Sequence, residues 1–136
     1  MSAAQAALPR AFLALGMLVL GSASPLPQAR PSGTTRTDLQ RHDLGVPGRE
    51  MLQARVDFAP ASTFPRHTHP GEEIIYVLEG ALEYEVAGKT VALKAGDVLF
   101  VPTGTVHAAR NRGTARAAEL ATYVLEKGKP LTTIVE

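Results

Sequence analysis

The chain has 136 residues and contains no cysteine. It therefore has no disulfide, no thiolate metal site and no cysteine nucleophile. It also lacks an excess of charge of either sign, because 14 lysine and arginine residues face 13 aspartate and glutamate residues, and the basic residues do not cluster with aromatic ones. Nucleic acid is therefore not expected as a partner. The length allows one domain with one core.

Long apolar stretches are lacking except near the N-terminus, where residues 11–21 read AFLALGMLVLG. This run is too short to span a bilayer, which takes about 20 apolar residues. Arg10 precedes it and the small residues Gly-Ser-Ala end it at Ala23, which is the pattern of a cleaved signal peptide over residues 1–23. A buried helix or an uncleaved anchor is the alternative, but no cap or amphipathic pattern accompanies the run. We therefore predict a periplasmic or secreted protein without stable membrane insertion after cleavage.

The next segment, residues 24–37, has no pattern of a core-forming element. Three prolines and a glycine interrupt it, which predicts a flexible lead-in. The folded domain is expected over residues 38–136, which is long enough for one small core.

A helical period is missing after the leader, and apolar residues alternate with polar ones instead. Turn residues separate seven or eight such segments at a spacing of roughly ten residues, which is typical of a small all-β barrel or sandwich. Residues 73–79 and 82–86 meet near Gly80 and are expected to pair as an antiparallel hairpin. The expected interior residues, assigned to core packing rather than to substrate contact, are Leu52, Val56, Phe58, Leu82, Tyr84, Val86 and Leu93.

Metal-ligating side chains recur at close spacing in the middle of the chain. His67 and His69 are separated by one residue, so their imidazoles project from the same face of an extended strand. Glu73 can complete an N,N,O set once the Pro-Gly turn at residues 70–71 folds back, and an adjacent strand can bring His107 to the same point. Three imidazoles and one carboxylate suit a divalent first-row transition metal.

Two further residues compete for these roles. Glu72 is adjacent to Glu73 but faces the other way if the segment is extended. His42 has no partner at ligand spacing, so it is interpreted as a surface histidine.

Taken together, these spacings resemble the two signature motifs of the cupin superfamily. The first motif stands here as His67-Thr68-His69, three residues, Glu73, six residues and Gly80. The second stands as Gly96, five residues, Pro102-Thr103-Gly104, two residues, His107, three residues and Asn111. The first motif usually opens with a glycine six residues before the first histidine, and this chain has Ala61 there. The resemblance covers roughly residues 52–125.

The resemblance implies a single small jelly-roll β-barrel that holds one divalent metal, either Fe, Mn, Ni or Zn. The implied ligands are His67, His69, Glu73 and His107. The implied turn formers are Gly80, Gly96, Pro102 and Gly104, and Asn111 is implied as a structural hydrogen-bonding residue. It also implies a homodimer, in which residues 38–58 would cover an edge strand.

Three kinds of function stay open at this point, because one fold hosts many reactions. The first is a metal-dependent enzyme, dioxygenase- or isomerase-like, that acts on a small oxygen-rich or aromatic molecule, with Glu73 or Glu72 as the proton acceptor. The second is an exported, non-catalytic module that binds a metal or a small ligand. The third, a barrel that the metal merely stabilises, is less favoured because four ligands leave two positions of an octahedron open. A separate nucleophile with its own base is not expected, because His42 is the one histidine outside the set.

Overall fold

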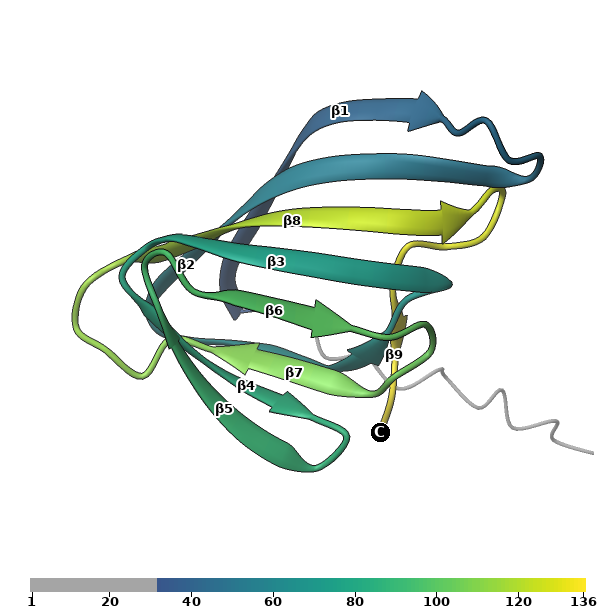
Figure 1. Ribbon diagram of the computed structural model, residues 1–136. Coiled ribbons are helices and arrows are strands. Elements are labelled where there is room, and N and C mark those ends of the chain that lie inside the picture. Colours follow the sequence, from purple (N-terminus) through teal and green to yellow (C-terminus); the bar gives the residue numbers. More distant parts are fainter. Residues whose placement is uncertain (1–31) are drawn as a thin grey trace, which may run out of the picture.

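The computed structural model describes residues 32–136 as a β-barrel (Figure 1). This part of the chain contains no helix, and so none that is long and apolar enough to cross a membrane. The predicted signal peptide, residues 1–23, lies outside the described residues. The strands are β1 (Ser32–Asp43), β2 (Arg49–Thr68), β3 (Gly71–Glu79), β4 (Ala81–Val86), β5 (Lys89–Lys94), β6 (Val98–Val101), β7 (His107–Arg110), β8 (Ala117–Glu126) and β9 (Thr133–Ile134).

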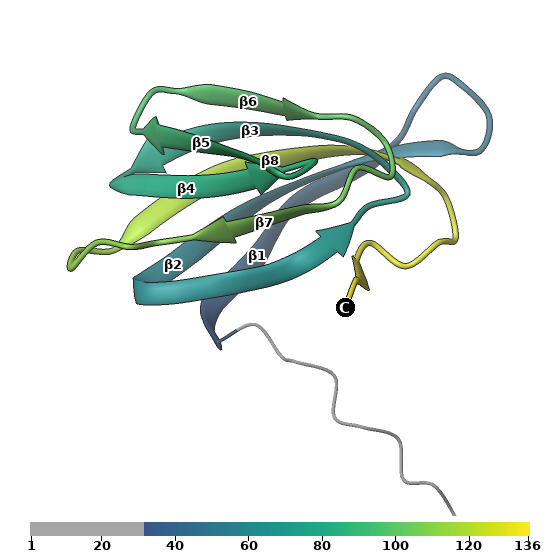
Figure 2. The same cartoon turned by 90° about the horizontal axis from the view of Figure 1, so that it is seen from below.

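The strands form two layers that share β2, in the order β5-β4-β7-β2-β8-β3-β6 (Figures 1 and 2). The first half of β2 pairs with β8, and its last residues pair with β7. β1 adds to the first half of β2, and β9 adds to its end. The all-β jelly-roll barrel expected from the sequence is therefore confirmed.

The long strand β2 changes layer at a bend around Ala61. This alanine has a φ of 56°, in the left-handed region that an alanine adopts only with strain. It is the position at which the first cupin motif usually has glycine, the residue that adopts this conformation without a Cβ clash. The chain thus keeps the bend although it lacks the glycine.

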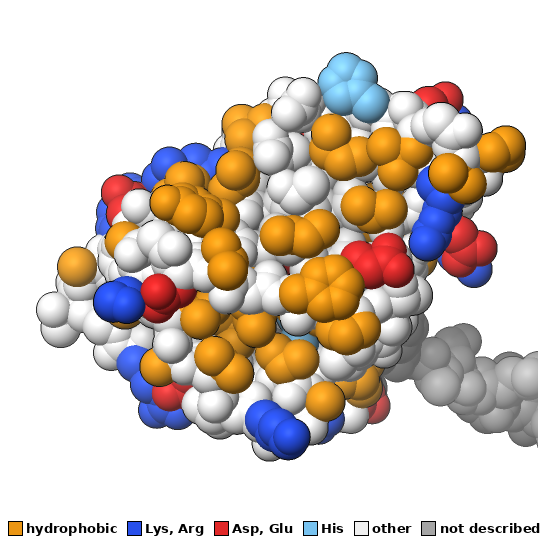
Figure 3. Space-filling view, viewed as in Figure 1, with side chains coloured by type: hydrophobic (Ala, Val, Ile, Leu, Met, Phe, Trp, Pro, Cys, Tyr) orange, Lys and Arg blue, Asp and Glu red, His pale blue; other side chains and the backbone are white. Residues whose placement is uncertain are grey.

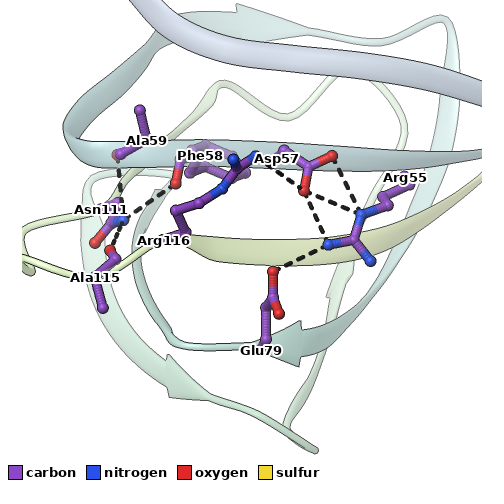
Figure 4. A network of polar contacts seen from close by, with 8 residues as sticks. All are labelled: Arg55, Asp57, Phe58, Ala59, Glu79, Asn111, Ala115 and Arg116. Carbon is purple, nitrogen blue, oxygen red and sulfur yellow. Dashed lines mark hydrogen bonds and ion pairs between the residues drawn. The ribbon is translucent and has the colours of Figure 1, made fainter.

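Asn111 fixes the inside of this bend (Figure 4). Its Nδ2 donates to the carbonyl oxygens of Phe58 and Ala59 at 3.3 and 3.2 Å and to that of Ala115 at 2.8 Å. Its Oδ1 accepts from the backbone N–H of Gly113. The side chain is 2% exposed, so these bonds join the loop between β7 and β8 to β2 away from solvent. The structural role implied for Asn111 is confirmed.

The expected hairpin between residues 73–79 and 82–86 is wrong. β3 pairs with β8 and β6, whereas β4 pairs with β5 and β7. Gly80, with a φ of 73°, is a corner at which the chain passes from one layer to the other. A Cβ there would lie 2.6 Å from the carbonyl oxygen of Arg116, so the corner packs too tightly for a larger residue. Alternation in neighbouring segments shows that both are strands, but not that they pair.

The domain also begins earlier than expected. β1 starts at Ser32, so residues 32–37 of the expected lead-in form a strand rather than a flexible segment. This strand is polar and largely exposed, and it is held by its backbone pairing with β2. Because it buries no apolar face, alternation could not reveal it.

The core lies between the two layers and contains the interior residues that the alternation predicts. Six of the seven are buried, and Val86 is partly buried against the same cluster. Tyr84, Phe58 and Val56 also line a cavity in this interior, so they contribute to a binding space as well as to packing.

We predict that Ala61→Gly stabilises the protein, because glycine removes the strain of the left-handed backbone. The free energy of unfolding should rise by about 1 kcal/mol. Ala59→Gly is the matched control two residues earlier in the same strand, where φ is not positive. That change should lower the free energy of unfolding by about 0.5–1 kcal/mol. Urea denaturation of both variants measures this, and equal effects would contradict the assigned strain.

Candidate metal centre

Three histidines and a glutamate from separate elements meet at one end of the barrel interior. His67 lies near the end of β2, His69 follows in the link to β3, Glu73 lies in β3 and His107 begins β7. His67 and His107 are cross-strand partners, and the i, i+2 spacing places His69 on the same side as His67. All four side chains are at most 5% exposed. The structure thus brings together the four residues that the sequence singled out.

The ligand atoms of this cluster converge. His67 Nε2 and His69 Nε2 are 3.2 Å apart, and the ligand atoms of the three histidines lie within 4.8 Å of one another. Glu73 Oε2 lies 3.0 Å from His107 Nε2 and 3.4 Å from His69 Nε2. Atoms that carry lone pairs approach this closely only when a proton or a cation lies among them.

The other ring nitrogen of each histidine is fixed by the backbone. His67 Nδ1 donates to the carbonyl oxygen of Pro65 at 2.8 Å, His69 Nδ1 to that of Leu131 at 2.6 Å and His107 Nδ1 to that of Thr105 at 2.9 Å. A carbonyl oxygen can only accept, so each Nδ1 carries a proton. In the neutral ring the lone pair is then on Nε2, which faces the centre.

Burial and neighbouring charges set the protonation of two members of the cluster. Burial, with His107 and His69 nearby, lowers the pKa of His67 to about 3, so this ring is neutral near pH 7. Burial alone would raise the pKa of Glu73, but hydrogen bonds that its carboxylate accepts from Nε2 of His107 and His69, when a proton rather than a metal lies there, outweigh burial and lower the pKa to about 2. A neutral imidazole and an ionised carboxylate are the forms that bind metals.

The two competing residues lie elsewhere. Glu72 points away from the cluster, where it accepts a hydrogen bond from Thr103 Oγ1 at 2.9 Å and lies 3.7 Å from Arg49. His42 is exposed on β1.

A cavity of about 340 Å³ opens from the cluster into the barrel. Its lining includes residues that the sequence did not single out: Thr34, Arg36, Phe64, Ala109, Glu119, Tyr123 and Thr132. Arg36 is the cross-strand partner of Val56, whose side chain faces inward; it lines the cavity from β1 and forms an ion pair with Asp38 at 2.9 Å. No motif marks these positions, because only the folded barrel brings them to one wall.

Glu119 is the least expected of these residues. It lies in β8, is 3% exposed and accepts a hydrogen bond from the Tyr84 hydroxyl across the barrel. Burial, together with the charge of Glu73, raises the pKa of Glu119 well above its usual value. The cavity therefore contains two buried carboxyl groups whose pKa values are shifted in opposite directions.

The donor set fits a metal ion. Three neutral imidazoles and a carboxylate around a divalent cation leave a local charge near +1. The carbonyl groups at the three Nδ1 atoms supply the outer hydrogen bonds that orient histidine ligands in metal sites. The cluster also borders the cavity, so a small molecule can reach it.

The fold and the site define a jelly-roll β-barrel with a metal-type donor set beside its cavity. A family model described as "Cupin domain" matches residues 54–125, which is 72 of the 136 residues. The chain belongs to the cupin family.

Curated relatives share the cupin core but are longer. Germin-like protein 1-1 from Oryza sativa subsp. japonica is 44% identical over 85 residues, which cover 58% of this chain and 39% of the relative. Tetracenomycin polyketide synthase protein TcmJ from Streptomyces glaucescens is 30% identical over 99 residues, which cover 72% of this chain and 65% of the relative. The chain spans about two fifths of the length of the germin-like relatives it matches.

Solved structures share the same fold. An oxalate oxidase in complex with glycolate has a TM-score of 0.61 at 28% identity, over 77% of this chain and 56% of that one. A cupin-2 domain from Rhodospirillum rubrum has a TM-score of 0.63 at 15% identity, over 79% and 69% of the two chains, and shows the fold alone.

We predict that Glu119→Gln changes how stability depends on pH. Because the pKa of Glu119 is raised on folding, the native state keeps a proton that the unfolded chain releases above pH of about 4.5. Wild-type stability should therefore fall relative to the variant as pH rises from 5 to 8, by at most about 1.4 kcal/mol per pH unit. Urea denaturation of chelator-treated protein at each pH measures the difference. A difference that stays constant with pH would contradict the assignment.

Proposed function

We propose that this protein is a metal-dependent enzyme of the dioxygenase or isomerase type that acts on a small oxygen-rich or aromatic molecule. The observation that carries the proposal is the arrangement of His67, His69 and His107, each with Nδ1 bonded to a backbone carbonyl and Nε2 aimed at the same point beside Glu73. The proposed cofactor is one divalent Fe, Mn, Ni or Zn ion held by these four residues. When bound, such an ion acts as a Lewis acid toward oxygen atoms or activates O₂.

The cavity supports a small oxygen-bearing substrate. Its volume of about 340 Å³ is in the range of small-molecule sites, and its walls combine apolar side chains with a few polar groups. On the β1 side Arg36 lines the cavity, and its guanidinium, which is paired with Asp38, can also donate a hydrogen bond to a substrate oxygen. The related oxalate oxidase is described in complex with glycolate, a small carboxylate.

In this proposal Glu73 can act as a metal ligand and as a proton acceptor. Its carboxylate binds the metal, and in its ionised form it can accept a proton from a substrate oxygen acid. Glu72, the alternative proton acceptor, lies outside the cavity beside Thr103 and does not reach a bound substrate.

Each of the four ligand substitutions, His67→Ala, His69→Ala, Glu73→Ala and His107→Ala, should lower metal affinity by more than roughly tenfold. The affinity of the wild-type protein should also fall in acid, because protons compete for the same lone pairs. His42→Ala is the matched control, since it removes a histidine that is exposed on β1. Metal analysis after competition with a chelator measures the affinity. Wild-type metal content in the four variants would contradict the ligand assignment.

Turnover separates the enzyme from the non-catalytic binding module. Protein loaded with iron, manganese, nickel or zinc should convert at least one member of a panel of catechols, flavonols, keto acids and sugars, followed by oxygen uptake and product mass. Activity should disappear on metal removal and in His107→Ala. If small oxyanions bind but no loaded form turns over, the protein is a binding module; activity that survives both changes would overturn the metal mechanism.

Export is proposed from the sequence of the leader. Arg10, the apolar run over residues 11–21 and the small residues up to Ala23 support cleavage after Ala23 and a periplasmic or secreted location.

A homodimer is also proposed, on a different surface from the one expected. Residues 38–58 belong to β1 and β2, which pair with each other, and the outer strand β1 is polar. Apolar side chains gather instead over β3 and the edge strand β6 (Figure 3). These exposed residues are Ile74, Tyr76, Leu78, Val98 and Phe100. A second copy of this face would cover both the apolar patch and the unpaired edge.

Native mass spectrometry of protein from the envelope fraction tests both proposals. We expect a subunit mass that corresponds to residues 24–136 and a complex of two subunits. Phe100→Glu, at the patch, should shift the complex to the monomer, whereas Leu39→Glu, which replaces an exposed residue of β1, should not. A full-length cytosolic species would refute export. A wild-type monomer across a wide concentration range would refute the dimer.

A further inference from the structure

The cavity contains a carboxyl group that the proposed metal centre does not use. Glu119 lines the same cavity as the histidine cluster and is almost fully buried. Among residues 32–136, its side-chain hydrogen-bond partner is the Tyr84 hydroxyl, and no lysine or arginine forms an ion pair with it. A buried carboxyl group without a cation is costly, and a purely structural role would be filled at lower cost by an apolar residue.

Apolar residues flank Glu119 on the two neighbouring strands. Its cross-strand partners are Val56 in β2 and Val77 in β3, both of which are buried. Tyr84 comes from β4 in the opposite layer, so the pair joins the two layers across the interior. The cavity wall is apolar at Val56, Phe58, Phe64 and Ala109, and its other polar residues include Thr34, Arg36 and Thr132.

Along β8, Glu119 lies apart from the part of the strand that contacts the histidine cluster. Tyr123 is the cross-strand partner of Glu73, and its ring lies 4.9 Å from that of His69. Glu119 faces the same interior four residues earlier, and at 3.2–3.4 Å per residue its backbone is roughly 13 Å along the strand from Tyr123. The side chains extend from these backbone positions into one cavity, where the charge of Glu73 acts on Glu119, so a ligand that touches both points needs oxygen atoms at two ends.

We infer that Glu119 and Tyr84 form a second polar anchor, which binds a neutral hydroxyl or carbonyl oxygen of a ligand whose carboxylate end lies at the histidine cluster. The ligand class is a small monoanion with an apolar body and oxygen functions at both ends. This inference rests on the proposed function, because it takes the carboxylate end to be held at the metal.

The hydrogen bonds available at the anchor match such an oxygen. The Tyr84 hydroxyl donates to Glu119, so in its protonated form the carboxyl group keeps its own O–H free to donate. The raised pKa of Glu119 favours this neutral form. A site built to hydrogen-bond a ligand hydroxyl discriminates strongly against the analogue that lacks it, because its buried polar groups are then left unpaired.

Matched ligands test the anchor in the manganese-loaded protein. Titration calorimetry gives the dissociation constants of benzoate, 3-hydroxybenzoate and 4-hydroxybenzoate, which differ only in the distal hydroxyl. In the wild-type protein at least one hydroxylated ligand should bind about tenfold more tightly than benzoate. Glu119→Leu should abolish this preference, Tyr84→Phe should weaken it, and Glu119→Gln, which keeps a donor, should retain part of it.

The control is Glu72→Gln, which changes a carboxyl group outside the cavity and should keep the full preference. Manganese content should be unchanged in the Glu119 variants, which separates the anchor from the ligand set. If benzoate binds but the wild-type protein shows no preference, or if Glu119→Leu keeps it, the inference is wrong and the proposed function stands. If the wild-type protein binds no manganese or no benzoate, the proposed function fails and the inference fails with it.

Discussion

The passage of β2 from one layer of the barrel to the other is the constraint on which the rest of the structure depends. Before the bend, β2 pairs with β8 and presents core residues; after it, the same strand pairs with β7 and presents His67 opposite His107. The bend requires a left-handed residue at Ala61, and Asn111 holds it from the other side with hydrogen bonds to Phe58 and Ala59. The strand thus links the stability of the barrel to the position of the histidine cluster.

Burial acts on both carboxyl groups of the cavity, but their pKa values shift in opposite directions. At Glu73 the cost of burial is outweighed by contacts with His69 and His107, so the carboxylate stays ionised. At Glu119 no described residue forms an ion pair, and burial together with the charge of Glu73 raises the pKa well above its usual value, which favours the protonated form. Two carboxyl groups in one cavity therefore offer opposite chemistry, one as a ligand or proton acceptor and the other as a hydrogen-bond donor.

The family match covers the ligands and most of the cavity wall, but not all of it. The family match ends at residue 125 and starts at 54, so it leaves out β1, which contributes Thr34 and Arg36 to the cavity, and the C-terminal segment, which contributes Thr132 and the Leu131 carbonyl that fixes His69. Segments outside the common core thus contribute part of the cavity wall. Differences in substrate among related barrels are expected to arise from such segments.

The sequence by itself determined the strands with a buried face and the residues of the histidine cluster, because alternation and ligand spacing are local properties of the chain. His67 and His69 share a face whatever strand lies beside them, and Leu52, Val56 and Phe58 mark an interior before any partner is known. Pairing was not determined in this way: β3 and β4 adjoin in sequence but lie in different layers, because Gly80 turns a corner that alternation does not record. β1 could not be recognised from the sequence, because it is held by backbone pairing and has no apolar face. Only the tertiary structure decided that Glu119 and Tyr84 meet, since they are 35 residues apart and belong to opposite layers.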